Sequence, residues 1–402
     1  MSGSVEVNVQ VKDKKSLSRL VELRINGNKI PAPMRAISIG RSSQEQLSLF
    51  QKAQINKEPV IAEAYAQLNI SQLEDCLDEE EGDENLRELS TSLNGVLSKA
   101  QESGNATMLV LSIMNNQNQP LNGLPDDRTL KLILDILWSP KNSIVVAPMF
   151  GLIRDGSDID NLIDLMAKQQ DNIVEKPIMA MLSSTYRPIA AYSIAKYWEQ
   201  GVRLFGIDME GRSLLSQTAI LNMTLRELNE LRQKSKEDFY YHGFNVKNRV
   251  GAGEKARVND LLAHGIGLDS TTKSHIVPRR AFPKVIDRQE QLRYIYFLQN
   301  LDYGYYNFSS ISGPQSETTL DIDKIALDGK TSRSIQSDTI SNIRNISNEH
   351  NLIRGWQEES RLREELSSSG TITDYLEKKK KVEDDVHTIE SFASKIRKGR
   401  GI

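Results

Sequence analysis

The hydrophobic positions of the chain fall into eight short runs before residue 275, each bounded by turn-forming residues. Most of these runs are apolar at consecutive positions, a pattern typical of strands that are buried on both faces of a parallel sheet. We therefore predict eight buried strands, at residues 30–39, 59–65, 107–113, 143–151, 176–182, 202–208, 239–244 and 265–269.

Helical patterns separate the later runs. Residues 158–169 place Ile159, Leu162 and Met166 on one helical face. Further helices are predicted at 188–200, 214–234 and 249–264, the last ending before Gly265. Alternating strands and helices indicate an α/β protein, and eight such units favour a (β/α)8 TIM-like barrel. A doubly wound parallel sheet stays open as the alternative, because strand number alone does not separate the two folds.

Two regions depart from this alternation. Residues 71–104 contain the acidic run 78–84, which predicts a solvated loop or insertion between the second and third strands. Beyond residue 275, the segment 276–306 is basic and aromatic, and 307–402 is rich in Ser, Asp and Asn. We predict a barrel domain at 1–275, a basic-aromatic segment at 276–306, and a helical, partly flexible C-terminal extension at 307–402.

Composition narrows the classes of protein to consider. The chain has 402 residues, a formal net charge of -3 and one cysteine, Cys76, which excludes an intrachain disulfide and a zinc site built from several cysteines. No HxH, HExxH or CxxC spacing occurs, so no metal cofactor is predicted. The chain has no apolar run long enough to cross a membrane and no signal-peptide core at its start, so we expect a cytoplasmic protein with no membrane partner.

Candidate chemistry lies where the predicted strands end, because barrel active sites gather at the carboxyl ends of the strands. Asp208 and Glu210 follow the sixth strand, and Asp269 closes the eighth. Crowded carboxylates push one another's pKa values apart, so that one serves as an acid and another as a base or nucleophile. The alternative is structural: Asp208 and Glu210 pair with nearby arginines, and Asp269 caps a helix before a Ser-Thr-Thr run.

The basic-aromatic segment and its approach form a candidate nucleic-acid surface. Aromatic side chains at 282, 294 and 296 are interleaved with the basic ones and are candidates to stack on bases. An amphipathic helix with a solvated basic face and an aromatic core face explains the same pattern. The predicted nucleic-acid-binding residues are Lys273, Arg279, Arg280 and Lys284.

Five segments within residues 20–275 resemble the tRNA-guanine transglycosylase superfamily, and its archaeal and DNA-modifying branches most of all. They are LRINGNKIPAPMRAISI (23–39), EPVIAEAYAQL (58–68), GVRLFGIDMEG (201–211), YYHGFN (240–245) and HGIGLDS (264–270). The last segment resembles the strand that carries the family's nucleophile, and this resemblance assigns that role to Asp269.

The resemblance implies that a carboxylate attacks the ribose C1′ and that a 7-deazaguanine then replaces a guanine in tRNA or DNA. It implies Asp269, Asp208 and Glu63 as catalytic residues. The implied substrate-binding residues are Glu210, Gly206, Gly211, Tyr65, His242, Gly243, Asn245 and Ser270.

The chain also departs from the family pattern. The family's Asp-Ser-Gly segment with a second catalytic aspartate has no match, since residues 108–116 contain no acid. The zinc-binding cysteines of many members are absent, so no zinc is expected. Glu63, Asp155 and Asp208 are the candidates to replace the missing acid.

Three hypotheses follow. The first is a base-exchanging enzyme, and the second is a catalytically altered barrel that binds nucleic acid or serves as a partner subunit. The third is an unrelated barrel enzyme with a small-molecule substrate. Two or more carboxylates converging in one pocket would favour an enzyme, and the C-terminal extension is a candidate contact surface for a second copy or another protein.

Overall fold

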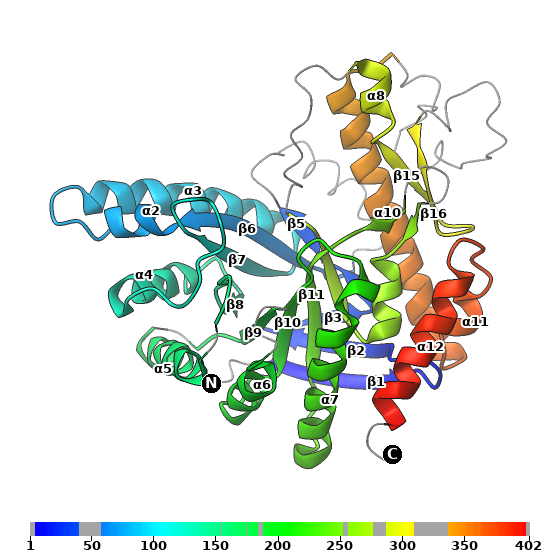
Figure 1. Ribbon diagram of the computed structural model, residues 1–402, viewed down its shortest axis with the longest axis horizontal. Helices are drawn as coiled ribbons and strands as arrows, with labels where there is room; N and C mark the ends of the chain where they lie inside the picture. Colours follow the sequence, from blue (N-terminus) through cyan, green and yellow to red (C-terminus); the bar gives the residue numbers. More distant parts are fainter. Residues whose placement is uncertain are drawn as a thin grey trace.

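A nearly closed barrel of parallel strands forms the centre of the molecule (Figure 1). The structure is a computed structural model that describes residues 5–39, 58–153, 155–173, 175–183, 188–251, 256–275, 287–308 and 337–398. The central sheet has the strand order β4-β14-β11-β10-β9-β8-β7-β6-β5. Its two edge strands, β4 (Met34–Arg35) and β5 (Ile37–Ile39), are consecutive pieces of one segment.

That segment brings the edges of the sheet together. β4 pairs with β14 (Ser270–Lys273), and β5 pairs with β6 (Ile61–Asn69). The edges of a doubly wound sheet lie far apart, so the TIM-like barrel prediction is confirmed and the doubly wound alternative is excluded. The remaining barrel strands are β7 (Ala106–Met114), β8 (Ile144–Val146), β9 (Ile178–Ser183), β10 (Leu204–Asp208) and β11 (Tyr240–Val246).

Consecutive apolar positions predicted most of these strands because the strands are buried on both faces. All nine residues of β7 are buried between the barrel interior and the helices outside it. Helices cover the outer face (Figure 1), and the predicted helices at 158–169, 188–200 and 214–234 are confirmed. The covering elements are α4 (Asp127–Leu137), α5 (Gly156–Asn172), α6 (Ala190–Glu199), η2 (Leu214–Gln217) and α7 (Thr218–Ser235).

The acidic run begins as predicted, with exposed residues 78–81 in a turn, but the wider region 71–104 is not an insertion. It forms α2 (Ile70–Asp75) and α3 (Gly82–Ser103), which together connect β6 to β7. Leu93, Val96 and Leu97 are buried on one face of α3. Asp83 and Glu84 lie in its first turn, where negative charge interacts favourably with the helix dipole. The acidic run thus spans an exposed turn and the start of a crossover helix of the barrel, and it is not an insertion.

The predicted helix at 249–264 and the predicted strand at 265–269 are also wrong. The chain instead forms β12 (Arg249–Val250), β13 (Arg257–Val258) and the short 3-10 helix η4 (Leu261–Ile266). Gly267, with φ of 100°, ends η4 in the left-handed region. Pairing with β11 begins only at Ser270, opposite His242. The eighth barrel strand therefore follows Asp269 instead of ending on it.

An antiparallel sheet precedes the barrel. It consists of β1 (Val5–Lys12), β2 (Arg19–Ile25) and β3 (Asn28–Ala32). The backbone N–H of Leu17, in the β1–β2 connection, donates to the carbonyl oxygen of Gly265 at 2.9 Å. This bond ties the connection to η4, just ahead of β14 in the chain, so this part of the sheet lies at the amino end of the barrel.

The C-terminal region packs on the barrel. Its described part beyond residue 337 is helical, as predicted, whereas the part within 287–308 also contains two strands. Leu362, Leu366, Val386 and Ile389 belong to the same buried cluster as the barrel core. α10 contacts β4 and β2, and α12 contacts α7 and η4. The elements are α8 (Arg288–Leu292), β15 (Tyr296–Gln299), β16 (Gly304–Asn307), α10 (Ile340–Ser368), α11 (Thr373–Leu376) and α12 (Glu383–Lys398). No helix in the described ranges is long and apolar enough to span a membrane.

Candidate active site

Glu63 lies at the base of a polar network that opens toward the carboxyl ends of the strands. Glu63, Tyr65 and Gln67 are alternate residues of β6 and therefore share one face of the strand. Glu63 is 1% exposed, Tyr65 is half-buried and Gln67 is exposed. The face thus passes from the closed barrel interior to solvent along the direction in which barrel active sites open.

Two histidines face the Glu63 carboxylate. His275 Nε2 lies 2.6 Å from Glu63 Oε1, and His242 Nε2 lies 3.6 Å from Glu63 Oε2. Among the described residues, Glu63 Oε2 has no hydrogen-bond partner although it is buried. Burial by itself would raise the pKa of Glu63, but His275 and His242 outweigh it and lower that pKa to about 2. The carboxylate therefore stays ionised at any ordinary pH. Its Oε2 accepts no hydrogen bond from a described residue.

His275 joins this carboxylate to the rest of the site. Its ring stacks on Tyr65 with 4.4 Å between the ring centroids and an interplanar angle of 5°. Its backbone N–H donates to Asn245 Oδ1 at 3.1 Å. The sequence reasoning missed His275, although it lies only two residues beyond the true end of β14. The correct strand boundary would have revealed it, because residues just past a barrel strand line the mouth.

Asp208, the last residue of β10, is the second buried carboxylate of the network. Its Oδ1 accepts hydrogen bonds of 2.9 Å from Asn245 Nδ2 and from the backbone N–H of Glu210. Burial raises the pKa of Asp208 to about 6, with the charges of Glu210 and Glu63 adding to the rise and the hydrogen bonds opposing it. Near neutral pH this group exchanges a proton readily, unlike Glu63.

Asn245 and Glu210 are held in an unusual backbone conformation beside Asp208. Both have positive φ, 52° for Asn245 and 53° for Glu210, a region that residues other than glycine seldom adopt. Asn245 bridges Asp208 to the backbone of His275 through the two ends of its amide. Residues held in sparsely populated conformations cluster at functional sites, so the strained backbone agrees with a functional assignment for this network.

His242 and Ser270 form the deepest layer. His242 is fully buried, and its Nδ1 lies 2.5 Å from Ser270 Oγ. Burial lowers the pKa of His242, with Glu63 opposing the change. Glu63, Tyr65, Asp208, His242, Asn245 and Ser270 were all predicted site residues, and the structure brings these six together.

Glu210 lies at the rim of the same network. Its carboxylate pairs with Arg212 at 3.0 Å and accepts a 3.4 Å hydrogen bond from Ser183. The structural alternative, an ion pair with a neighbouring arginine, is therefore present for Glu210. Asp208 makes no salt bridge with a described residue.

Asp269 does not belong to the site, and its placement at the carboxyl end of the eighth strand is wrong. It precedes β14 at the amino end of the barrel and is 2% exposed. Arg19 Nε donates to Asp269 Oδ1 at 3.1 Å, and the backbone N–H of Tyr241 donates to Oδ2 at 2.7 Å. Arg19 also donates a second bond to Oδ2. Asp269 thus fastens β2 to the amino end of β11, and it is not a helix cap either.

The predicted glycines serve the packing of the backbone. A Cβ on Gly206 would lie 2.2 Å from the Phe244 ring, and one on Gly243 would lie 2.7 Å from Leu268 Cδ1. Gly211 has φ of 65° in the turn after β10, where its N–H donates to the carbonyl oxygen of Asn245. Phe244 therefore occupies the space beside Gly206 that the resemblance would give to a bound base.

The predicted nucleic-acid surface is described only in part. Lys273 ends β14, and its Nζ donates to Asn348 of α10 at 3.0 Å. Tyr294 is exposed. The Tyr296 ring packs against Arg249, whose Cζ lies 3.5 Å from the ring centroid. Phe297 is buried, but it lies on β15, so the amphipathic helix of the alternative is not formed at this aromatic residue. Arg279, Arg280 and Lys284 lie outside the described residues.

Asp155 and a possible metal site are the two remaining candidates for chemistry. Asp155 caps the start of α5, where its side chain accepts a hydrogen bond from the N–H of Ser157. Within the described ranges, no group of three or more His, Cys, Asp or Glu side chains is arranged to hold a metal ion. Neither a metal-ligand set nor a role for Asp155 in the polar network is therefore supported by the described residues.

The chain matches no protein-family model, and the comparison with curated proteins gives no significant match. The resemblance to the transglycosylases thus rests on the five sequence segments and agrees with the barrel.

Proposed function

We propose that the protein is a barrel enzyme that exchanges a base in a polynucleotide, with Glu63 and Asp208 as its catalytic carboxylates. The observation that carries the proposal is that His275 and Asn245 link two buried carboxylates, Glu63 and Asp208. Their different surroundings lower the pKa of Glu63 to about 2 and raise that of Asp208 to about 6. Two carboxylates with opposed environments are the usual arrangement for breaking a glycosidic bond. The substrate class comes from the sequence resemblance, and the residue roles come from the network.

In the first step, Glu63 Oε2 forms a bond to the ribose C1′ while the bond from C1′ to the departing guanine breaks. The departing base takes the proton of Asp208. In the second step, a nitrogen of the incoming 7-deazaguanine attacks C1′ and releases Glu63, while the Asp208 carboxylate accepts the proton of that nitrogen. Glu63 suits the first role because it stays ionised, and Asp208 suits the second because its pKa lies near the working pH.

The neighbours of these groups support the same assignment. His275 and Tyr65 form a stacked aromatic wall beside Glu63, and Glu210 presents a carboxylate at the rim. A carboxylate accepts hydrogen bonds from the N–H edge of a purine, and an aromatic wall contacts the face of a base or a sugar. Asn245 fixes Asp208 and His275 at a constant separation by bonding to both.

The test is to incubate the protein with tRNA or with duplex DNA and a radiolabelled 7-deazaguanine, and to measure label in the polymer. Glu63→Gln and Asp208→Asn are expected to lower incorporation by about 100-fold or more. Asp155→Asn is the matched control, because asparagine also caps helices well. If Glu63→Gln or Asp208→Asn incorporated label as well as wild type, that residue would not be catalytic. If the wild-type protein incorporated no label into tRNA or DNA, the proposed reaction would be refuted.

The placement of Asp269 favours one second candidate function. The resemblance gives the nucleophile's role to a residue that the structure places in a salt bridge at the opposite end of the barrel. A barrel that has lost that nucleophile could retain nucleic-acid binding without exchange. Salt-sensitive binding of tRNA or DNA with no incorporation of label would select this function over base exchange.

A further inference from the structure

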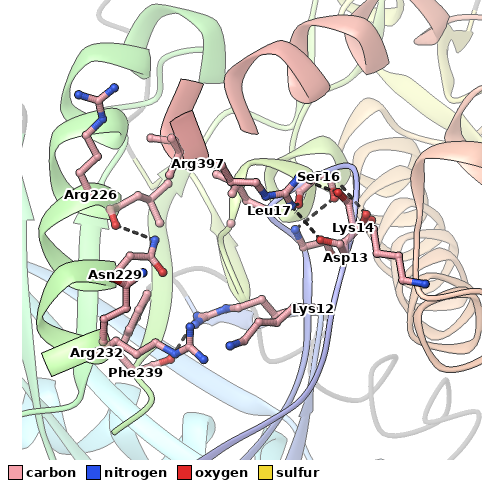
Figure 2. Close-up of a pocket in the computed structure, with 16 residues that line it drawn as sticks. Lys12, Asp13, Lys14, Ser16, Leu17, Arg226, Asn229, Arg232, Phe239 and Arg397 are labelled. Atoms are coloured by element: carbon pink, nitrogen blue, oxygen red, sulfur yellow. Dashed lines mark hydrogen bonds between the residues drawn. The ribbon is translucent and has the colours of Figure 1, made fainter. Parts of the chain in front are cut away.

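We propose that a second site, at the amino end of the barrel, binds a phosphorylated small molecule of nucleotide size. The site is a cavity of about 420 Å³, within the usual size range of small-molecule sites. Its walls come from β1 and the β1–β2 connection, from α7, and from the end of α12 (Figure 2). Phe239 and Gly267, which precede β11 and β14, also line it, so this amino-end cavity lies away from the Glu63 network.

The charge of the lining points to an anion. Six cationic side chains line the cavity against one carboxylate, Asp13. Figure 2 shows Lys12 and Arg232 extending toward each other from opposite walls. Arg19 and Arg232 are neutralised by Asp269 and Asp238. In the described part of the chain, the other four cations make no salt bridge: Lys12, Lys14, Arg226 and Arg397.

Asp13 offsets only one of these positive charges, and its carboxylate oxygens face backbone N–H groups rather than the cations. Oδ1 accepts from the backbone N–H groups of Lys15 and Ser16, and Oδ2 accepts from that of Ile372. An ionic ligand with several negative charges would thus meet an excess of positive charge inside a concave, partly apolar space, where charge–charge interactions are stronger than in bulk water.

Two of the cations are already held in place. Arg397 donates to the carbonyl oxygens of Lys14 and Asp13 at 2.7 and 2.8 Å, so its guanidinium is fixed although no carboxylate neutralises it. Arg226 donates to the carbonyl oxygen of Lys395 at 3.2 Å, while its Nε is buried with no hydrogen-bond partner among the described residues. The fixed guanidinium of Arg397 carries a positive charge that an anionic oxygen would neutralise.

The remaining lining selects a ligand with an apolar part. Leu225, Ile396 and Phe239 are buried residues that present apolar surface to the cavity, and Leu17 is half-buried beside them. A nucleotide combines a flat ring with a chain of phosphates, and so matches an apolar floor with a cationic rim. Because α12 and α7 both contribute cations, the ligand would also link the C-terminal helix to the barrel.

The probes are ATP, inorganic tripolyphosphate and adenosine, each titrated calorimetrically into the full-length protein without magnesium at low salt. ATP and tripolyphosphate are expected to bind, ATP more tightly, and adenosine is not. Binding should weaken as salt is raised. Lys12→Gln removes an exposed cavity lysine and is expected to weaken ATP binding about tenfold. Lys29→Gln, an exposed lysine of β3 outside the cavity, is the matched control.

Failure of both phosphate probes to bind would overturn the proposal, as would equal weakening by Lys12→Gln and Lys29→Gln. A single-stranded oligonucleotide is the further arm. If only the oligonucleotide bound, and Lys12→Gln weakened it, the site would be a nucleic-acid contact rather than a small-molecule site. Binding of ATP that persists in Glu63→Gln, with no base exchange, would support this site independently of the proposed reaction.

Discussion

His275 Nε2 lies 2.6 Å from Glu63 Oε1, although 212 positions separate the two residues in the chain. One comes from the second strand of the barrel and the other from just beyond the last, which are separated in the ring only by the β4–β5 segment. The contact keeps a fully buried carboxylate ionised, and the stacked Tyr65 ring keeps the imidazole in place.

Replacement of His275 by glutamine should shift the acid limb of the pH–rate profile of base exchange to higher pH. Without the imidazole, burial dominates, and the pKa of Glu63 rises from about 2 toward or above its ordinary value of 4.5. The rate profile of the wild type should be flat from pH 4 to 5, whereas that of His275→Gln should fall as pH decreases through this range. His387→Gln, an exposed histidine of α12, is the control. An unchanged profile would exclude His275 as the group that sets this pKa.

Asp269→Asn should lower stability rather than chemistry. The substitution leaves Arg19 buried without its anionic partner, which costs about 3 to 5 kcal/mol in free energy of unfolding. Urea denaturation measures the change. Asp374→Asn, which removes the exposed pair with Lys15, is expected to change stability far less. Folded Asp269→Asn protein that exchanges base at a normal kcat would agree with the structure, and a normal stability with no exchange would restore Asp269 as a catalytic candidate.

The two carboxylates should have opposite effects on stability. The folded-state pKa of Asp208 is raised from 3.8 to about 6, so its contribution to stability is present below pH 4 and is lost as pH rises through 6. Glu63 has a lowered pKa, so its contribution is present above pH 4.5 and is lost as pH falls through 2. At pH 8, Asp208→Asn should therefore be more stable than wild type, and Glu63→Gln less stable, each by about 3 kcal/mol.

Urea denaturation at pH 4, 6 and 8 measures both effects. The gain of Asp208→Asn should vanish by pH 4, where the wild-type carboxyl is already neutral. The loss of Glu63→Gln should persist at pH 6 and begin to shrink near pH 4. Two variants that destabilise equally at every pH would show that the pKa values of the two groups are not pushed apart.

Two glycines should respond to alanine in opposite directions. Gly206→Ala places a Cβ against the Phe244 ring and should cost about 1 to 3 kcal/mol by overpacking. Gly95, in the interior of α3, has nothing within 4 Å of its ideal Cβ position, so Gly95→Ala should stabilise by about 0.5 to 1 kcal/mol. Thermal denaturation distinguishes the two. A neutral Gly206→Ala would mean that the space beside this glycine is open, as a base-binding role requires.

The barrel could be predicted because its strands are buried on both faces. Runs such as 107–113 are apolar at consecutive positions, and the helices between the later runs have one apolar face each. The eighth strand gives no such signal, because Ser270, Thr271 and Thr272 are polar yet fully buried in the sheet. Their hydroxyls lie against neighbours such as His242, and one sequence does not reveal such contacts.

Most of the polar network could also be predicted, whereas the role of Asp269 could not. Glu63, Asp208 and Asn245 follow from the strand ends or from the resemblance. Asp269 depends on Arg19, 250 positions away, in a sheet whose first two strands lie outside every consecutive apolar run. That sheet carries alternating valines in β1, a half-buried pattern that does carry a signal. Because the predicted eighth strand ended at Asp269 and the actual strand begins at Ser270, the prediction placed this aspartate at the carboxyl end of the barrel instead of the amino end.

Mass spectrometry of the covalent intermediate tests the role of Glu63 most directly. The protein is incubated with a tRNA or DNA substrate in the absence of the incoming base, and its intact mass and the masses of its peptides are then measured. A ribosyl or deoxyribosyl adduct on the peptide that contains Glu63, absent in Glu63→Gln, is expected. An adduct on the peptide that contains Asp269, or exchange by Glu63→Gln at the wild-type rate, would contradict it.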